Sequence, residues 1–167
     1  MNRLPATELA VLNEFLDFYR TVLARKAEGL TTGQLRRTTS ASNLTLGGLI
    51  KHMALVEDSW FTIRFTDQPA PEPWASASWE TDADWELTSA ANDSPEELLA
   101  LYDAACERSR VVVAATPSLD APMPSENLGK GGPCNLRWIM VHMIEEYARH
   151  TGHADIIRES IDGQTGD

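Results

Sequence analysis

The segment that decides the fold is residues 135–160, NLRWIMVHMIEEYARHTGHADIIRES, which is typical of a long α-helix. It holds three of the chain's four histidines, His142, His150 and His153, with Glu146 among them. Successive residues of an α-helix are rotated by about 100°, so His142, Glu146 and His150 lie on one face and His153 returns to the same sector. The helix therefore presents a carboxylate and an imidazole one turn apart, which is part of what a divalent metal site requires.

Apolar residues recur with helical spacing in three further segments, residues 7–28, 46–65 and 94–116. Gly29 follows the first segment, where a C-terminal cap is expected. The third opens with Ser94-Pro95-Glu96-Glu97, a capping-box signature, and ends before Pro117. Four amphipathic helices in 167 residues favour an all-α fold over any sheet fold, and we expect a single domain, residues 1–167, that forms a four-helix bundle.

Two long connections join these helices, residues 68–93 and 118–134. The first is rich in proline, serine, alanine and acidic residues, and it contains Trp74, Trp79 and Trp85. A connection of this length is functional or packed as a loop of its own. Three tryptophans predict that it packs against the helices.

Composition excludes several functional classes. The net charge of −11 would repel phosphate backbones and anionic membrane surfaces, so we expect no nucleic-acid or membrane partner. No run reaches the roughly 18 uninterrupted apolar residues of a membrane span, and the start of the chain lacks the apolar core of a signal peptide. The two cysteines, Cys106 and Cys134, show no metal-binding or disulfide spacing. We therefore expect a cytoplasmic protein.

Two stretches resemble a known family. They are LTLGGLIKHMALVE at residues 44–57, followed by Trp60-Phe61, and LRWIMVHMIEEYARHTGHAD at residues 136–155. Both are similar to the DinB/YfiT-like superfamily, which includes the metal-binding domain of mycothiol-dependent maleylpyruvate isomerases and thiol S-transferases. The closing Gly-His-Ala-Asp is a specific part of the match.

The resemblance implies a four-helix bundle with a divalent metal held by one residue of the second helix and two of the fourth. His52 matches the ligand of the second helix, and His150 matches the second histidine of the fourth. Many members have His-x-x-x-His in the fourth helix, whereas this chain has Glu146 at the first position, as the maleylpyruvate isomerase-like members do. The implied ligands are His52, Glu146 and His150.

Two imidazoles and one carboxylate suit zinc best, with nickel, manganese and iron possible, and three protein ligands leave one position open. The resemblance implies that a low-molecular-weight thiol binds there as a thiolate and attacks an electrophile, so that neither cysteine of the chain need act as nucleophile. It also implies a homodimer. Arginine outnumbers lysine 11 to 3, which indicates a GC-rich source and favours mycothiol as the thiol.

Four other residues are candidates for the site. His153 is expected to act in catalysis, as a base or as a group that hydrogen-bonds a ligand, or to lie exposed near the helix end. Trp60 and His142 would line a pocket for the bound molecules, or belong to the core. Arg149 would hold a substrate carboxylate, or be a surface charge. Gly152 would allow a neighbouring helix to approach closely.

Three alternatives remain open. The same metal site would suit a hydrolase, with a metal-bound hydroxide as nucleophile and His153 as base. The protein could instead be a non-catalytic, stress-associated protein that only binds a metal or ligand. In a purely structural bundle, the histidines would pair within the core. Dependence of turnover on added thiol separates the first two from an S-transferase, and the structural alternative predicts no bound metal.

Overall fold

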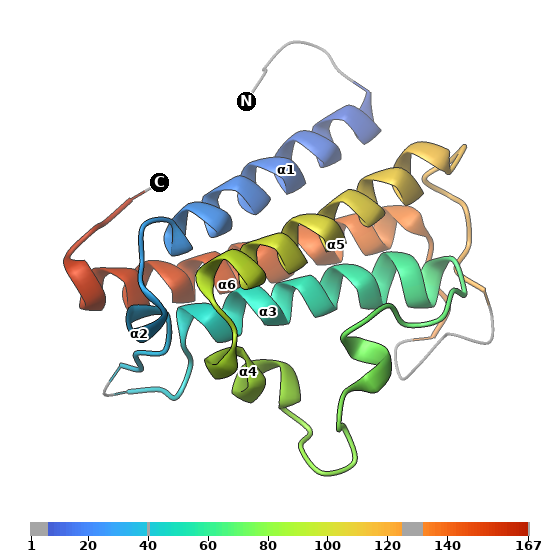
Figure 1. Cartoon of the computed structure of the whole chain (residues 1–167). Coiled ribbons are helices and arrows are strands. Elements are labelled where there is room, and N and C mark those ends of the chain that lie inside the picture. Colours follow the sequence, from blue (N-terminus) through green and yellow to red (C-terminus); the bar gives the residue numbers. More distant parts are fainter. Residues whose placement is uncertain (1–6, 40, 125–131, 167) are drawn as a thin grey trace.

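The computed structural model describes residues 7–39, 41–124 and 132–166 (Figure 1). Within these residues there is no β-strand, so the all-α prediction is confirmed. The long helices are α1 (Glu8–Ala27), α3 (Leu46–Glu57), α5 (Pro95–Ala115) and α6 (Leu136–Asp162). The shorter elements are α2 (Thr32–Leu35), η1 (Asp58–Phe65), η2 (Trp74–Ser76), α4 (Trp85–Ser89) and η3 (Ala90–Asn92). None of the described helices combines the length and apolar character that crossing a membrane requires.

The predicted helix ends are close to the observed ones because capping residues fix them. The Ser94 hydroxyl accepts a hydrogen bond from the Glu97 amide, and the Glu97 carboxylate accepts one from the Ser94 amide. Asn135 caps α6 through the Trp138 amide. At the other end, Gly163 adopts φ 79°, a left-handed conformation that ends the helix two residues beyond the predicted Ser160.

The second predicted helix, residues 46–65, is helical throughout, but its last eight residues form a π-helix, η1. The change occurs at Asp58, which is fully buried. Its carboxylate accepts hydrogen bonds from Arg108 Nε at 2.8 Å and from Trp74 Nε1 at 2.7 Å. Asp58 thus joins η1 to α5 and to the connection that follows, where an unpaired buried charge would be costly.

The long helices pack around one apolar core, with α1 against α6 and α3 against both α5 and α6 (Figure 1). A buried polar network crosses this core. Arg20 donates two hydrogen bonds of 2.8 Å to the fully buried Glu57 carboxylate, which also accepts one from the Tyr147 hydroxyl at 2.7 Å. Tyr102 donates to Tyr147 at 2.9 Å. This network therefore links helices α1, α3, α5 and α6 next to Glu146.

The connection of residues 68–93 packs on the helices, as its tryptophans predict. Trp74 is buried, and Trp85 makes edge-to-face contacts with both Trp74 and Trp79. Lys51 of α3 lies over the Trp85 ring at 4.7 Å and pairs with Asp93 at 2.6 Å. These contacts place α4 beside the start of α3 (Figure 1).

The close approach predicted at Gly152 is wrong. Gly152 is exposed, and a Cβ there would meet no atom within 4 Å. Close approach occurs instead at Gly48, where a Cβ would lie 3.3 Å from the Leu87 carbonyl oxygen. The missing side chain at Gly48 is what allows α4 to sit against α3.

Candidate metal centre

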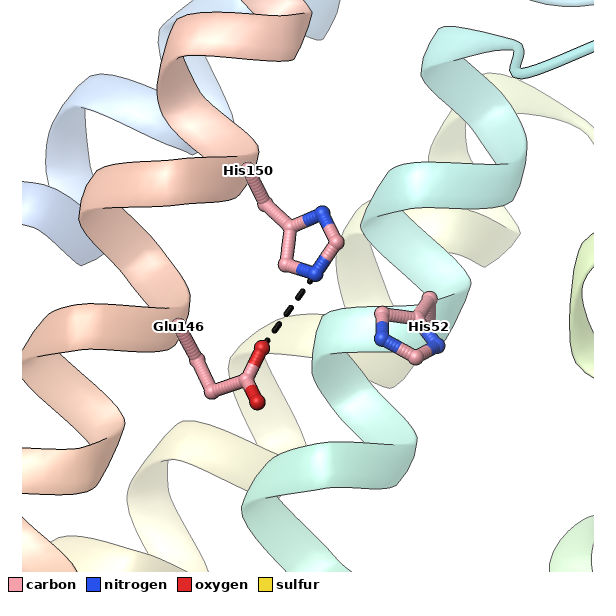
Figure 2. Close-up of side chains that lie close together, drawn as sticks. All are labelled: His52, Glu146 and His150. Carbon is pink, nitrogen blue, oxygen red and sulfur yellow. Dashed lines mark ion pairs between the residues drawn. The ribbon is translucent and has the colours of Figure 1, made fainter.

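His52, Glu146 and His150 face one another across the space between α3 and α6 (Figure 2). Each offers one ligand atom, and these atoms all lie within 4.8 Å of one another. His150 Nε2 is 3.3 Å from Glu146 Oε2, and the His52 and His150 ring centroids are 5.0 Å apart. The structure thus brings together the three residues that the sequence resemblance implies.

Helix geometry and core packing explain this convergence. Glu146 and His150 are four residues apart on α6 and so lie on one face. Tyr147, the next residue after Glu146, is anchored in the core by Glu57 of α3. The three side chains are only partly exposed, at 26% for His52, 17% for Glu146 and 14% for His150. The three ligand side chains are therefore largely, but not completely, shielded from water.

Glu86 of α4 orients His52. Its Oε1 atom lies 2.9 Å from His52 Nδ1, and its side chain is 8% exposed. The other ring nitrogen of His52 faces Glu146 and His150 (Figure 2). A carboxylate on the far nitrogen of a metal-binding histidine fixes the tautomer and raises the basicity of the ligand. Sequence reasoning missed Glu86, because no apolar periodicity marks the short helix that carries it.

His150 is in the protonation state that metal binding requires. Burial lowers its pKa from 6.5 to about 4, with further lowering from His52, His153 and Arg149. At neutral pH the imidazole is therefore uncharged, and a ring nitrogen has a lone pair available. Two imidazoles and a carboxylate, drawn from two helices, form a donor set that fits zinc or nickel.

His142 belongs to an aromatic cluster at the edge of the site. Its ring stacks on Trp138 at 5.0 Å and meets Trp60 edge-on at 4.8 Å. His142, Glu145 and Glu146 also bring ligand atoms within 4.8 Å of one another. These three come from one helix, and Glu145 is exposed and paired with Arg149. The two-helix group His52, Glu146 and His150 is therefore the better candidate.

His153 adjoins the candidate metal centre, whereas Arg149 lies on the surface. The His153 ring is 5.5 Å from that of His150, and its buried Nδ1 atom has no hydrogen-bond partner among the described residues. The Arg149 side chain is 54% exposed, and its Nη1 is 3.9 Å from Glu146 Oε2. Arg149 is thus placed as a surface charge that reaches one edge of the site.

Neither cysteine supplies a ligand atom to this group. Cys106 is buried beside Glu57, and burial raises its pKa to about 12. Cys134 is partly buried and lies 3.8 Å from the Met123 sulfur, in a small cavity that Trp60 and Trp138 also line. Because the thiolate is the reactive form, burial and the raised pKa make the Cys106 thiol unreactive.

Comparison with known proteins extends these observations. The family model for mycothiol-S-transferase matches residues 11–163. A crystal structure described as a conserved protein from Enterococcus faecalis superposes with a TM-score of 0.72 at 15% identity, covering 96% of this chain and 100% of that one, and so shows a shared fold. No curated protein matches the chain. The family match agrees with the resemblance of residues 44–57 and 136–155, and the chain belongs to the mycothiol S-transferase family.

Proposed function

We propose that this protein is a metal-dependent S-transferase that joins the sulfur of a low-molecular-weight thiol, mycothiol or a close relative, to an electrophilic small molecule. The observation that carries the proposal is the convergence of His52, Glu146 and His150, three partly buried side chains from two helices. Membership of the mycothiol S-transferase family supports the choice of thiol.

His52, Glu146 and His150 would hold zinc, or alternatively nickel. Three protein ligands leave a coordination position open, as catalytic zinc sites do. A divalent cation held there lowers the pKa of a thiol beside it, so that the thiolate predominates at neutral pH. Glu86 acts on His52, whose Nδ1 it holds at 2.9 Å, and so directs the other ring nitrogen toward the site.

The reaction breaks the S–H bond of the thiol and the bond between the electrophilic carbon and its leaving group, forms a carbon–sulfur bond, and releases the leaving group as an anion together with a free proton from the thiol. His153 is proposed to accept that proton at its buried Nδ1, which has no competing partner among the described residues. The aromatic rings of Trp60 and His142 would form a wall against the electrophile. Arg149, on the exposed edge, would pair with a carboxylate if the electrophile carries one.

The test is consumption of an alkylating electrophile such as monobromobimane by zinc-loaded protein, with and without mycothiol. The proposal expects turnover that requires both thiol and metal and is lost in His150→Ala. Glu145→Gln is the matched control, because Glu145 is an exposed acid on the same helix. Turnover of an ester or amide without thiol would point to a hydrolase, and binding without turnover would point to a non-catalytic protein.

Two further expectations are part of the proposal. We propose that the protein works as a homodimer in the cytoplasm and that the whole chain forms one domain. Sedimentation of the purified protein over a range of concentrations measures whether it forms a dimer. A single cooperative unfolding transition, seen by both circular dichroism and tryptophan fluorescence, is the expected result for one domain.

A further inference from the structure

A cavity of about 240 Å³ lies beside the candidate metal centre, between the connection from α2 to α3 and the last turns of α6. His153 lines this cavity, and the His153 ring is 5.5 Å from that of His150. Pockets that enclose a whole drug-sized molecule measure about 300–1,000 Å³. The cavity therefore suits part of a small molecule, such as a ring or a short chain, and not all of it.

The cavity lies at one end of the space between the two helices that carry the proposed ligands. Helices α3 and α6 run in opposite directions, with His52 beside His150 (Figure 1). Leu44 comes just before the start of α3, and Ile157 comes near the end of α6. These two residues are therefore at the same end of the helix pair, and both line the cavity.

The chemistry of this cavity suits apolar ligand atoms. Leu44 packs against the apolar core, and Ile157 is buried. The Ser42 hydroxyl, at the exposed rim, already accepts a hydrogen bond from the Leu44 amide. Among the described residues that line the cavity there is no aspartate, glutamate, lysine or arginine. A charged group placed there would lose its hydration without gaining a partner of opposite charge, whereas an apolar group would gain from leaving water.

Ile156 adds an exposed apolar side chain to the same wall. It is 65% exposed, the largest fraction among the large apolar side chains that the structure describes. Single exposed apolar residues are ordinary, but this one borders a cavity with a buried apolar wall. A ligand group that occupied the cavity would cover part of Ile156, and removing that surface from water is favourable.

We infer that this cavity, the apolar subsite, holds an apolar substituent of the electrophile, an aromatic ring or a short aliphatic chain, and so selects the class of electrophile that reacts. The inference rests on the proposed function for the reaction itself. It places the substituent beside His153, with the rings of Trp60 and His142 at the opposite end of the site. Electrophiles that lack an apolar substituent, or carry a charged one in its place, are poor substrates.

A probe that cannot react locates the apolar subsite without reference to activity. N-benzylacetamide, which has no leaving group, is titrated into zinc-loaded protein whose isoleucine δ1 methyl groups are isotopically labelled for NMR. We expect the bound ring to shift the methyl signals of Ile156 and Ile157. The signal of Ile63 in η1, which does not line the cavity, should stay in place. Unchanged signals for Ile156 and Ile157 would overturn the inference.

Selectivity is measured with two electrophiles that share a reactive carbon, bromoacetamide and N-benzylbromoacetamide. In each, the thiolate forms a bond to the same carbon and bromide leaves with the electron pair of the carbon–bromine bond. We expect kcat/KM of the wild type to favour the benzyl compound at least about tenfold, and this ratio to be at least about threefold smaller in Ile156→Ser. Val111→Ser is the matched control and should keep the wild-type ratio, because Val111 is 60% exposed and lines a separate cavity of about 450 Å³.

The outcomes separate this inference from the proposed function. Thiol-dependent turnover with no preference for the benzyl compound, or with the same preference in Ile156→Ser as in the wild type, would overturn the inference and leave the proposed function standing. An unchanged preference in an Ile156→Ser protein that has lost a dimer would assign Ile156 to a contact between two copies of the chain instead. Methyl shifts at Ile156 and Ile157 without any thiol-dependent turnover would refute the proposed function and keep the cavity as a binding site for apolar groups.

Discussion

Glu86 Oε1 lies 2.9 Å from His52 Nδ1, although 34 residues separate the two in the chain. The contact makes the connection between η1 and α5 part of the candidate metal centre. The packing of Trp74 and Trp85 and the Lys51–Asp93 ion pair fix the position of α4. Helix α4 in turn holds Glu86 beside His52.

Replacing Glu86 by Gln should weaken metal binding. The variant keeps the size of the side chain and removes the charge that raises the basicity of His52, and loss of such a partner typically costs about 10–100-fold in metal affinity. Competition with a chromogenic zinc chelator measures this effect without reference to activity. Glu80→Gln, an exposed change in the same connection, is the control. Equal zinc affinity in Glu86→Gln and wild type would show that Glu86 has no role in the site.

Arg20→Met should destabilise the fold far more than Arg110→Met. Arg20 is buried and forms a bidentate pair with Glu57, so its loss leaves an unpaired buried carboxylate, at a cost of about 3–5 kcal/mol. Arg110 pairs with Asp17 on the exposed surface, and such pairs contribute about 0–1 kcal/mol. Urea unfolding of both variants gives the comparison. Similar free energies of unfolding would contradict the role assigned to the buried network.

Alanine at Gly152 and at Gly48 should have opposite effects on stability. Gly152 is helical with open space around it, so Gly152→Ala should stabilise the protein by up to about 1 kcal/mol. At Gly48 a Cβ would lie 3.0 Å from Thr45 Oγ1 and 3.3 Å from the Leu87 carbonyl, so Gly48→Ala should displace α4 and lower Tm. If Gly152→Ala is less stable than the wild type, a neighbouring helix must approach closely at Gly152 after all.

Cys106 should resist alkylation in the native protein. Burial raises its pKa to about 12, so at pH 8 only about one thiol in ten thousand is ionised, and the thiolate is the reactive form. The thiolate fraction rises with pH, but burial still limits access below the unfolding transition. Mass spectrometry after iodoacetamide treatment should find Cys106 unmodified in native protein and modified in urea. Rapid native labelling at pH 8 would show that this part of the core opens readily.

The sequence predicted the parts of the site that depend on local periodicity. Glu146 and His150 share a face because they are four residues apart in a well-capped helix, and that spacing is visible in the chain. His52 was placed with them through the family resemblance, since spacing within one helix cannot identify a partner on another. Glu86 was missed because it lies in a short helix whose position depends on tryptophan packing.

Two structural details were also beyond sequence reasoning. The apolar pattern of the sequence does not distinguish the π-helix that begins at Asp58 from an α-helix. In the structure the π-helix begins where Asp58 is buried and bonded to Arg108 and Trp74. Gly152 and Gly48 look alike in sequence, and only the packing of α4 against α3 shows which one permits close approach.

The most direct test of the metal centre is the metal content of untagged protein, measured by mass spectrometry beside His150→Ala and Glu145→Gln. Glu145 belongs to the competing group with His142, so Glu145→Gln distinguishes the two candidate sites. We predict close to one zinc or nickel per chain in the wild type and in Glu145→Gln, and its loss in a folded His150→Ala. No metal in the wild type, even after zinc and nickel are supplied, would contradict the account.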